Sequence, residues 1–190
     1  MDVFTLCIVV VGALLRLVPH IPNFTPVGAV ALFGGAGLSK RRAFTVPLLV
    51  MALSDYLLLY INPYASPMVD FHKVYPIWAL VHPMTLYVWG SFCISGLLGF
   101  WLRKHLSVRN VIFISLAGSV QFFLITSFGV WAGGMYSRGI NGLIESFMMG
   151  LPFFRWTVLG DFFYCGIFFG VYALVQKMVR INSVVSNRSL

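Results

Sequence analysis

The side chains best able to do chemistry in this sequence are charged groups that interrupt long apolar runs. Asp55 lies within the apolar run 43–61, Asp161 lies near the start of the run 156–175, and Arg16 stands near the end of the run 3–18. A charge inside a bilayer costs at least about 2.5–3.5 kcal/mol, so such residues normally face a partner or a water-filled cavity. These residues predict a polar pocket inside an apolar protein.

The chemistry that the sequence predicts is binding rather than catalysis. It contains no nucleophile elbow, no zinc-protease helix, no phosphate-cradling loop and no closely spaced pair of carboxylates. The four histidines are scattered and make no metal-ligand pattern; they are His20, His72, His82 and His105. We therefore expect no enzyme activity, no cofactor and no metal.

Further polar groups follow the run 111–132 toward the same end of the predicted bundle, namely Gln121, Thr126 and Ser127. Each of them taken alone favours interhelical hydrogen bonding, which commonly holds helices together in lipid. Arg16 and Asp161 also have a purely structural alternative, because side chains near helix ends can extend to the interface. Asp55 could likewise pair with Arg16 and fasten two helices together.

The segment Pro19–Pro26 is the most unusual stretch of the chain. It holds three prolines in eight residues, PHIPNFTP, which excludes a regular helix. Irregular backbone is tolerated at a membrane edge where it is buried in protein or lines a cavity. The segment could bring Asn23 and backbone carbonyls to a ligand, or it could be only a rigid turn between two short helices.

Composition identifies the elements that must position these residues. The 190-residue chain is 59% hydrophobic and 9% charged, whereas soluble domains are roughly 45–50% apolar and 25% charged. We expect an all-α integral membrane bundle of about six transmembrane helices in one domain, 1–190. The predicted helices cover 3–18, 27–38, 43–61, 77–102, 111–132 and 156–175, and a helical lid covers 139–151 on the outer side.

Basic residues set the expected orientation, because short loops rich in Lys and Arg stay cytoplasmic. Nine of the thirteen cations fall into three clusters, which are Lys40, Arg41 and Arg42; Arg103, Lys104 and Arg109; and Lys177, Arg180 and Arg188. These clusters occupy alternate connections and the C-terminal tail, which predicts that both termini are cytoplasmic. Topology thus explains the net charge of +8, and we expect no nucleic-acid partner.

Small residues lie on one face of the predicted helix 27–38, at Gly28, Ala31 and Gly35. Such spacing lets helices approach closely. The face could pack inside the bundle, or it could dock against a separate membrane protein.

Several motifs carry a resemblance to a family of small bacterial membrane proteins. They are RLVPHIPNFTPVGAVALFGGA at 16–36, Ser54-Asp55, TSFGVW at 126–131, Met135-Tyr136, Pro152-Phe153-Phe154 and Gly160-Asp161. That family is similar to the substrate-binding S components of energy-coupling-factor (ECF) transporters, and the resemblance covers nearly the whole chain. S components bind vitamins or metal ions on their outer side and dock onto a transmembrane coupling subunit served by two cytoplasmic ATPases.

The resemblance implies a substrate-binding subunit for the uptake of a vitamin or related small molecule across the bacterial inner membrane. We expect Arg16 and Asn23 to anchor the ligand and Asp55 and Asp161 to contact it or to shape the pocket. Ser127 adds a hydroxyl, and aromatic walls come from Phe24, Trp131 and Tyr136. The first helix of this chain is bulky where S components often carry small docking residues, so Gly28, Ala31 and Gly35 are candidates for docking to the coupling subunit. The alternative is a non-transport membrane protein, either a structural or assembly partner or an intramembrane enzyme.

Overall fold

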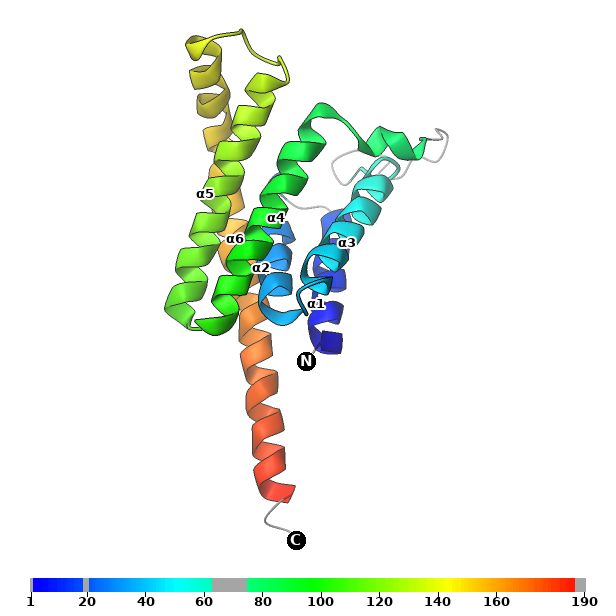
Figure 1. Cartoon of the computed structure of the whole chain (residues 1–190), viewed down its shortest axis with the longest axis vertical. Helices are drawn as coiled ribbons and strands as arrows, with labels where there is room; N and C mark the ends of the chain where they lie inside the picture. The colour runs from blue at the N-terminus through cyan, green and yellow to red at the C-terminus, as the bar shows by residue number, and fades with distance from the viewer. Residues whose placement is uncertain (1, 19–20, 63–74, 187–190) are drawn as a thin grey trace.

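A computed structural model describes residues 2–18, 21–62 and 75–186, so His20, His72 and Arg188 lie outside the described residues. The described elements are all helical, as predicted (Figure 1). The α-helices are α1 (Asp2–Leu14), α2 (Val27–Gly37), α3 (Arg42–Leu58), α4 (Pro83–Lys104), α5 (Val108–Ala132) and α6 (Ile140–Ser186). Two short 3₁₀ turns accompany them, η1 (Leu15–Leu17) and η2 (Ile77–Leu80).

Three of the described helices are long and apolar enough to cross a membrane, which indicates a membrane protein. They are Pro83–Lys104, Val108–Ala132 and Ile140–Ile181. Helix α2 has only 11 residues and is therefore about 16 Å long, about half of a hydrocarbon core of roughly 30 Å. Six α-helices are confirmed, but a count of six membrane spans stays a prediction.

Helix α2 is the buried centre of the molecule. It packs against α1, α3, α4, α5 and α6. Nearly every residue from Val27 to Gly35 is buried, and a helix that is apolar all round is typical of a core position. Phe33 lies in an aromatic cluster with three side chains of α6, namely Phe168, Phe169 and Tyr172.

Helices α2 and α4 cross with their backbones in contact. A Cβ atom at Gly35 would overlap the carbonyl oxygen of Gly96, and a Cβ atom at Gly99 would overlap the carbonyl oxygen of Leu32. Only glycine allows this approach, since it removes the side chain that would separate the two helices. Helix α3 covers another side of α2.

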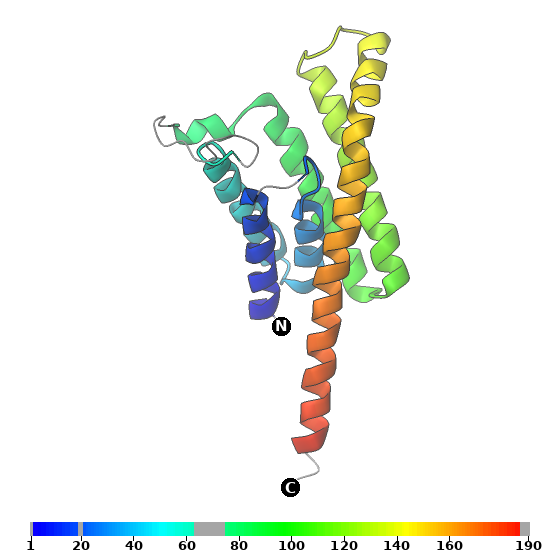
Figure 2. The same ribbon diagram turned by 180° about the vertical axis from the view of Figure 1, so that it is seen from behind.

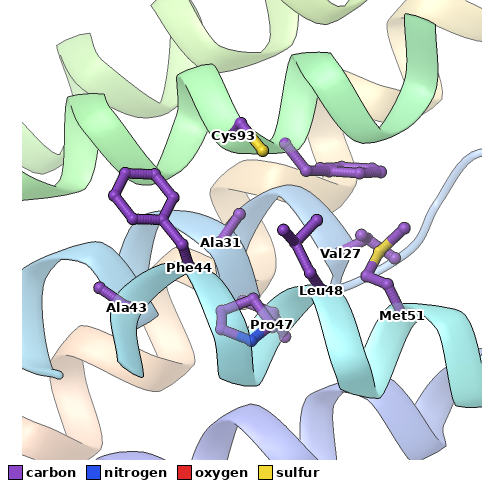
Figure 3. A pocket seen from close by; sticks show the side chains of 10 residues that line it. Val27, Ala31, Ala43, Phe44, Pro47, Leu48, Met51 and Cys93 are labelled. Carbon is purple, nitrogen blue, oxygen red and sulfur yellow. The ribbon is translucent and has the colours of Figure 1, made fainter. Parts of the chain in front are cut away.

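Figure 3 shows the layer between α2, α3 and α4, where Ala31, Leu48 and Cys93 surround a small void. The void measures about 10 Å³, which is at the lower limit for one water molecule, and its lining is apolar. This layer is packed core and does not serve as a ligand site.

Arg103 joins α4 to the C-terminal end of α2. Its guanidinium group donates hydrogen bonds to the carbonyl oxygens of Gly35 at 2.6 Å, Ala36 at 3.1 Å and Leu38. The last carbonyls of a helix lack partners within the helix, so Arg103 satisfies groups that would otherwise be unpaired. The contact also places two predicted basic clusters, 40–42 and 103–109, at one end of the molecule, where both marked termini also point (Figure 1).

The predicted lid at 139–151 is not a separate element. Residues 140–151 and the predicted helix 156–175 form one continuous helix, α6, of 47 residues with Pro152 inside it (Figure 2). Helix α5 provides the surface that holds the early part of α6, because Ser146 donates a hydrogen bond of 2.7 Å to the carbonyl oxygen of Ser127 and Phe147 packs against Phe123. The expected break between 139–151 and 156–175 is absent, while a lid role for 140–151 stays a prediction: Ser146 and Phe147 contact α5, but Ile140, Ile144, Met148 and Leu151 are exposed.

Candidate functional site

Arg16 and Asp55 form an ion pair at one end of the helical bundle. The Nη1 atom of Arg16 lies 2.6 Å from Oδ1 of Asp55 and donates a hydrogen bond of 2.7 Å to Oγ of Ser54. The indole nitrogen of Trp89 donates to the other carboxylate oxygen of Asp55 at 3.0 Å. The pair joins η1, α3 and α4, which is the fastening role that the sequence left open for these residues.

Asp161 is the most buried charged side chain of the site, with 4% of its surface exposed. Its Oδ2 atom accepts a hydrogen bond of 2.6 Å from the Ser119 hydroxyl on α5. Its Oδ1 atom lies so close to Gly28 on α2 that a Cβ atom at position 28 would overlap it. Asp161 has no cationic partner among the described residues. Because α6 begins at Ile140, Asp161 lies well inside α6, and its predicted place near a helix start was wrong.

Asp161 borders a cavity that opens between α2, α4, α5 and α6. The cavity has a volume of about 170 Å³. It is lined by Arg16, Asn23, Thr25, Val27, Gly28, Val88, Phe92, Ser95, Gly118, Phe122, Thr157 and Asp161. We call it the inner cavity. It combines one buried carboxylate with hydroxyl, amide and aromatic groups.

A second cavity, which we call the outer cavity, adjoins the inner one. It measures about 350 Å³ and shares Asn23, Phe122 and Thr157 with the inner cavity. Between α5 and the early part of α6 it reaches the polar and aromatic residues Thr126, Ser127, Tyr136, Ser146, Phe153 and Phe154. A third cavity of about 280 Å³ lies beside the ion pair and shares Arg16 and Val88 with the inner cavity.

The predicted site residues divide into two groups in the structure. Six of them line the three cavities: Arg16, Asn23, Asp55, Ser127, Tyr136 and Asp161. Phe24 instead packs against Phe163 and Tyr164 of α6, and Trp131 packs against Phe128. The aromatic walls of the inner cavity come from Phe92 and Phe122, which the sequence analysis did not single out.

The irregular segment before α2 brings Asn23 to both cavities. Asn23 adopts a left-handed backbone conformation, with φ of 65°, which asparagine tolerates better than most residues. The following residues lie against α6, because a Cβ atom at Gly160 would come within 3.1 Å of the Thr25 nitrogen and 3.2 Å of the Phe24 Cα. The position of Asn23 is that of a residue able to contact a ligand.

The small residues that were candidates for docking lie inside the helical bundle. Ala31 is 3% exposed, Gly35 faces α4, and Gly28 faces Asp161. Packing within the bundle accounts for their small size. Docking of a partner on this face stays a prediction.

Sequence reasoning missed the hydroxyl groups that support the site. Ser119 holds Asp161, and Ser95 lines the inner cavity while accepting a hydrogen bond of 3.0 Å from the Gln121 amide. A signal was present in the spacing, since Ser91 and Ser95 are four residues apart, as are Ser115 and Ser119. Hydroxyl pairs on one helix face of an apolar run indicate a polar interior seam.

The arrangement is suited to binding a small molecule. Within the described residues His, Cys, Asp and Glu do not gather in groups of three or more that could hold a metal ion. The acidic and basic side chains along the three cavities are Arg16, Asp55, His82 and Asp161. With His82 neutral and both carboxyl groups deprotonated, their formal charges sum to minus one.

The sequence matches the family described as "Family of unknown function (DUF6580)" over residues 1–184. No curated protein and no solved structure matches the chain.

Proposed function

The chain belongs to the DUF6580 family of unknown function, and we propose from its cavities that it is a substrate-binding membrane subunit for uptake of a small nutrient such as a vitamin. One observation carries this proposal. A cavity of about 170 Å³ with a buried carboxylate joins a cavity of about 350 Å³ with polar and aromatic walls. Ligand sites usually combine mostly apolar walls with a few polar groups that fix orientation.

The depth of the site supports a transport role. If α5 crosses the bilayer, Ser119 and its partner Asp161 lie near the middle of the membrane, since Ser119 is near the middle of Val108–Ala132. The outer cavity continues from there toward Met135 and Tyr136, just beyond the end of α5. In the predicted orientation this end faces outward, so a solute would enter from outside and reach the membrane interior.

The similarity to ECF S components supports the same role. The size of the chain, its six α-helices and the common direction of its termini agree with such a subunit (Figure 1). In this proposal the protein resides in the bacterial inner membrane with both termini in the cytoplasm. A separate transmembrane coupling subunit with cytoplasmic ATPases supplies the energy.

The first test is native mass spectrometry of the protein purified in detergent from its own host. We expect a retained small molecule, together with a coupling subunit and ATPases under mild extraction. Thr157 lies where the two cavities meet, so Thr157→Phe should fill the passage and abolish retention of the molecule. Leu159→Phe is the matched control, because Leu159 is 50% exposed on the same helix.

Two results would contradict the proposal. A wild-type protein with no retained molecule that co-purifies with an unrelated protein would favour a structural or assembly role. Equal retention by the Thr157→Phe and wild-type proteins would place the bound molecule elsewhere.

A further inference from the structure

We infer that the inner cavity selects a small organic cation, whose protonated amine or equivalent positive group lies against Asp161 and whose apolar body lies against Phe92 and Phe122. This inference rests on the proposed function, because it names the class of substrate that the same site takes. It adds a charge requirement that neither the family match nor the resemblance to S components supplies.

The charges around the cavities favour a cationic ligand. Arg16 is already matched by Asp55, at 2.6 Å, and that carboxylate also accepts from Trp89. Asp161 receives only the neutral Ser119 hydroxyl among the described residues. Asp161 is therefore the carboxyl group of the site without a cationic partner among the described residues, and a cation bound beside it would favour its ionised form in a region where an unpaired charge is costly.

The position of Asp161 lets a ligand in the inner cavity reach its carboxyl group. Only 4% of Asp161 is exposed, yet its side chain borders the inner cavity. The absence of a side chain at Gly28 lets the carboxyl group pack directly against the α2 backbone at the wall of the cavity, since a Cβ atom at position 28 would overlap Oδ1. A cation in the cavity would thus meet a carboxylate that is held by Ser119 and desolvated, which strengthens a charge-assisted hydrogen bond.

The walls of the cavity favour an organic cation over a metal ion. Divalent metal ions take several charged or carbonyl oxygens, whereas the inner cavity offers one carboxylate. Phe92 and Phe122 present aromatic surface, which attracts organic cations. The volume of about 170 Å³ is sufficient for a benzene-sized group, since an apolar cavity of about 150 Å³ admits benzene.

Benzylamine is the probe, and benzyl alcohol is its neutral isostere. Binding to the purified protein in detergent is measured by isothermal titration calorimetry. We expect benzylamine to bind the wild-type protein about tenfold or more tightly than benzyl alcohol, as one charged hydrogen bond provides. Asp161→Asn should remove this preference and leave the affinity for benzyl alcohol unchanged.

Two further variants control for the loss of charge and for a failure of Asp161→Asn to fold. Glu145→Gln removes the same charge from an exposed position on the same helix, so it should bind benzylamine like the wild-type protein. Should Asp161→Asn fail to fold, Ser119→Ala keeps the carboxylate but removes its donor, and it should weaken the binding of benzylamine more than that of benzyl alcohol.

The outcomes separate this inference from the function on which it rests. Equal affinity for the two probes, unchanged benzylamine binding in Asp161→Asn, or no binding of benzylamine to the wild-type protein would overturn the cation inference. A retained neutral or anionic molecule in native mass spectrometry would also overturn it while leaving the uptake proposal standing. Absence of any retained molecule would count against the uptake proposal itself.

Discussion

The guanidinium group of Arg16 and the carboxylate of Asp55 meet at 2.6 Å, across 39 positions of sequence, and both side chains are only partly exposed, at 17% and 25%. This contact joins the end of the first helical segment to α3. It also decides which charge of the site stays free for a ligand. Arg16 is matched within the chain, whereas Asp161 is not.

Removal of one member of this pair should destabilise the protein. Asp55→Asn leaves the partly buried Arg16 without its counterion, and we expect a loss of about 3 kcal/mol at most, because breaking a fully buried pair costs about 3–5 kcal/mol. The double substitution Arg16→Met with Asp55→Leu should recover most of that loss. Thermal unfolding in detergent, followed by circular dichroism, measures both. A double variant less stable than the single one would show that the ion pair is not the cause.

Two substitutions at Asn23 should separate its backbone from its side chain. Asn23→Gly retains the left-handed conformation and should leave the unfolding temperature close to that of the wild-type protein, while lowering retention of the bound molecule. Asn23→Ala should cost about 1–2 kcal/mol of stability, because a Cβ atom without a compensating polar group disfavours positive φ. The melting temperature and native mass spectrum of each variant provide the readouts. Equal stability of the two variants would contradict a left-handed residue at this position.

The crossing of α2 and α4 should be sensitive to a single methyl group. Gly99→Ala places a Cβ atom against the carbonyl oxygen of Leu32, so we expect a loss of about 1–3 kcal/mol, as for overpacked cores. Gly90→Ala on the same helix has no heavy atom within 4 Å of the new Cβ atom and should not destabilise the protein. Unfolding temperatures of the two variants, compared in one detergent, decide the matter. Similar values would contradict the close crossing.

The orientation can be tested by labelling single cysteines. In a background with Cys7, Cys93 and Cys165 replaced by alanine, Ser137→Cys lies between α5 and α6 and Ser39→Cys lies between α2 and α3, and both positions are exposed. A membrane-impermeant maleimide should label Ser137→Cys in intact cells, and it should label Ser39→Cys only after the cells are permeabilised. The reverse pattern would invert the proposed topology.

The sequence alone determined that the protein is all-helical and apolar enough for a membrane. Apolar runs fixed five of the six helices to within a few residues at most ends, because burial in lipid or core requires long uninterrupted apolar stretches. The alternation of basic clusters predicted that 40–42 and 103–109 lie at the same end of the bundle. The contact of Arg103 with the C-terminal end of α2 agrees with that placement. Rare acids within apolar runs likewise indicated Asp55 and Asp161 as residues of interest.

Only the tertiary structure decided which partner each of those residues contacts. Pairing depends on distances between segments far apart in sequence, so composition could not tell that Asp55 meets Arg16 while Asp161 meets a neutral Ser119. The extent of α6 was also decided by the tertiary structure, because the apolar spacing of 140–151 is compatible with a separate segment and with a continuous helix, and the contact that holds this stretch on α5 is made by Ser146. The Asp161 carboxyl group lies where a Cβ atom at Gly28 would be, and this close packing between α2 and α6 is a tertiary contact that no single segment of the sequence reveals.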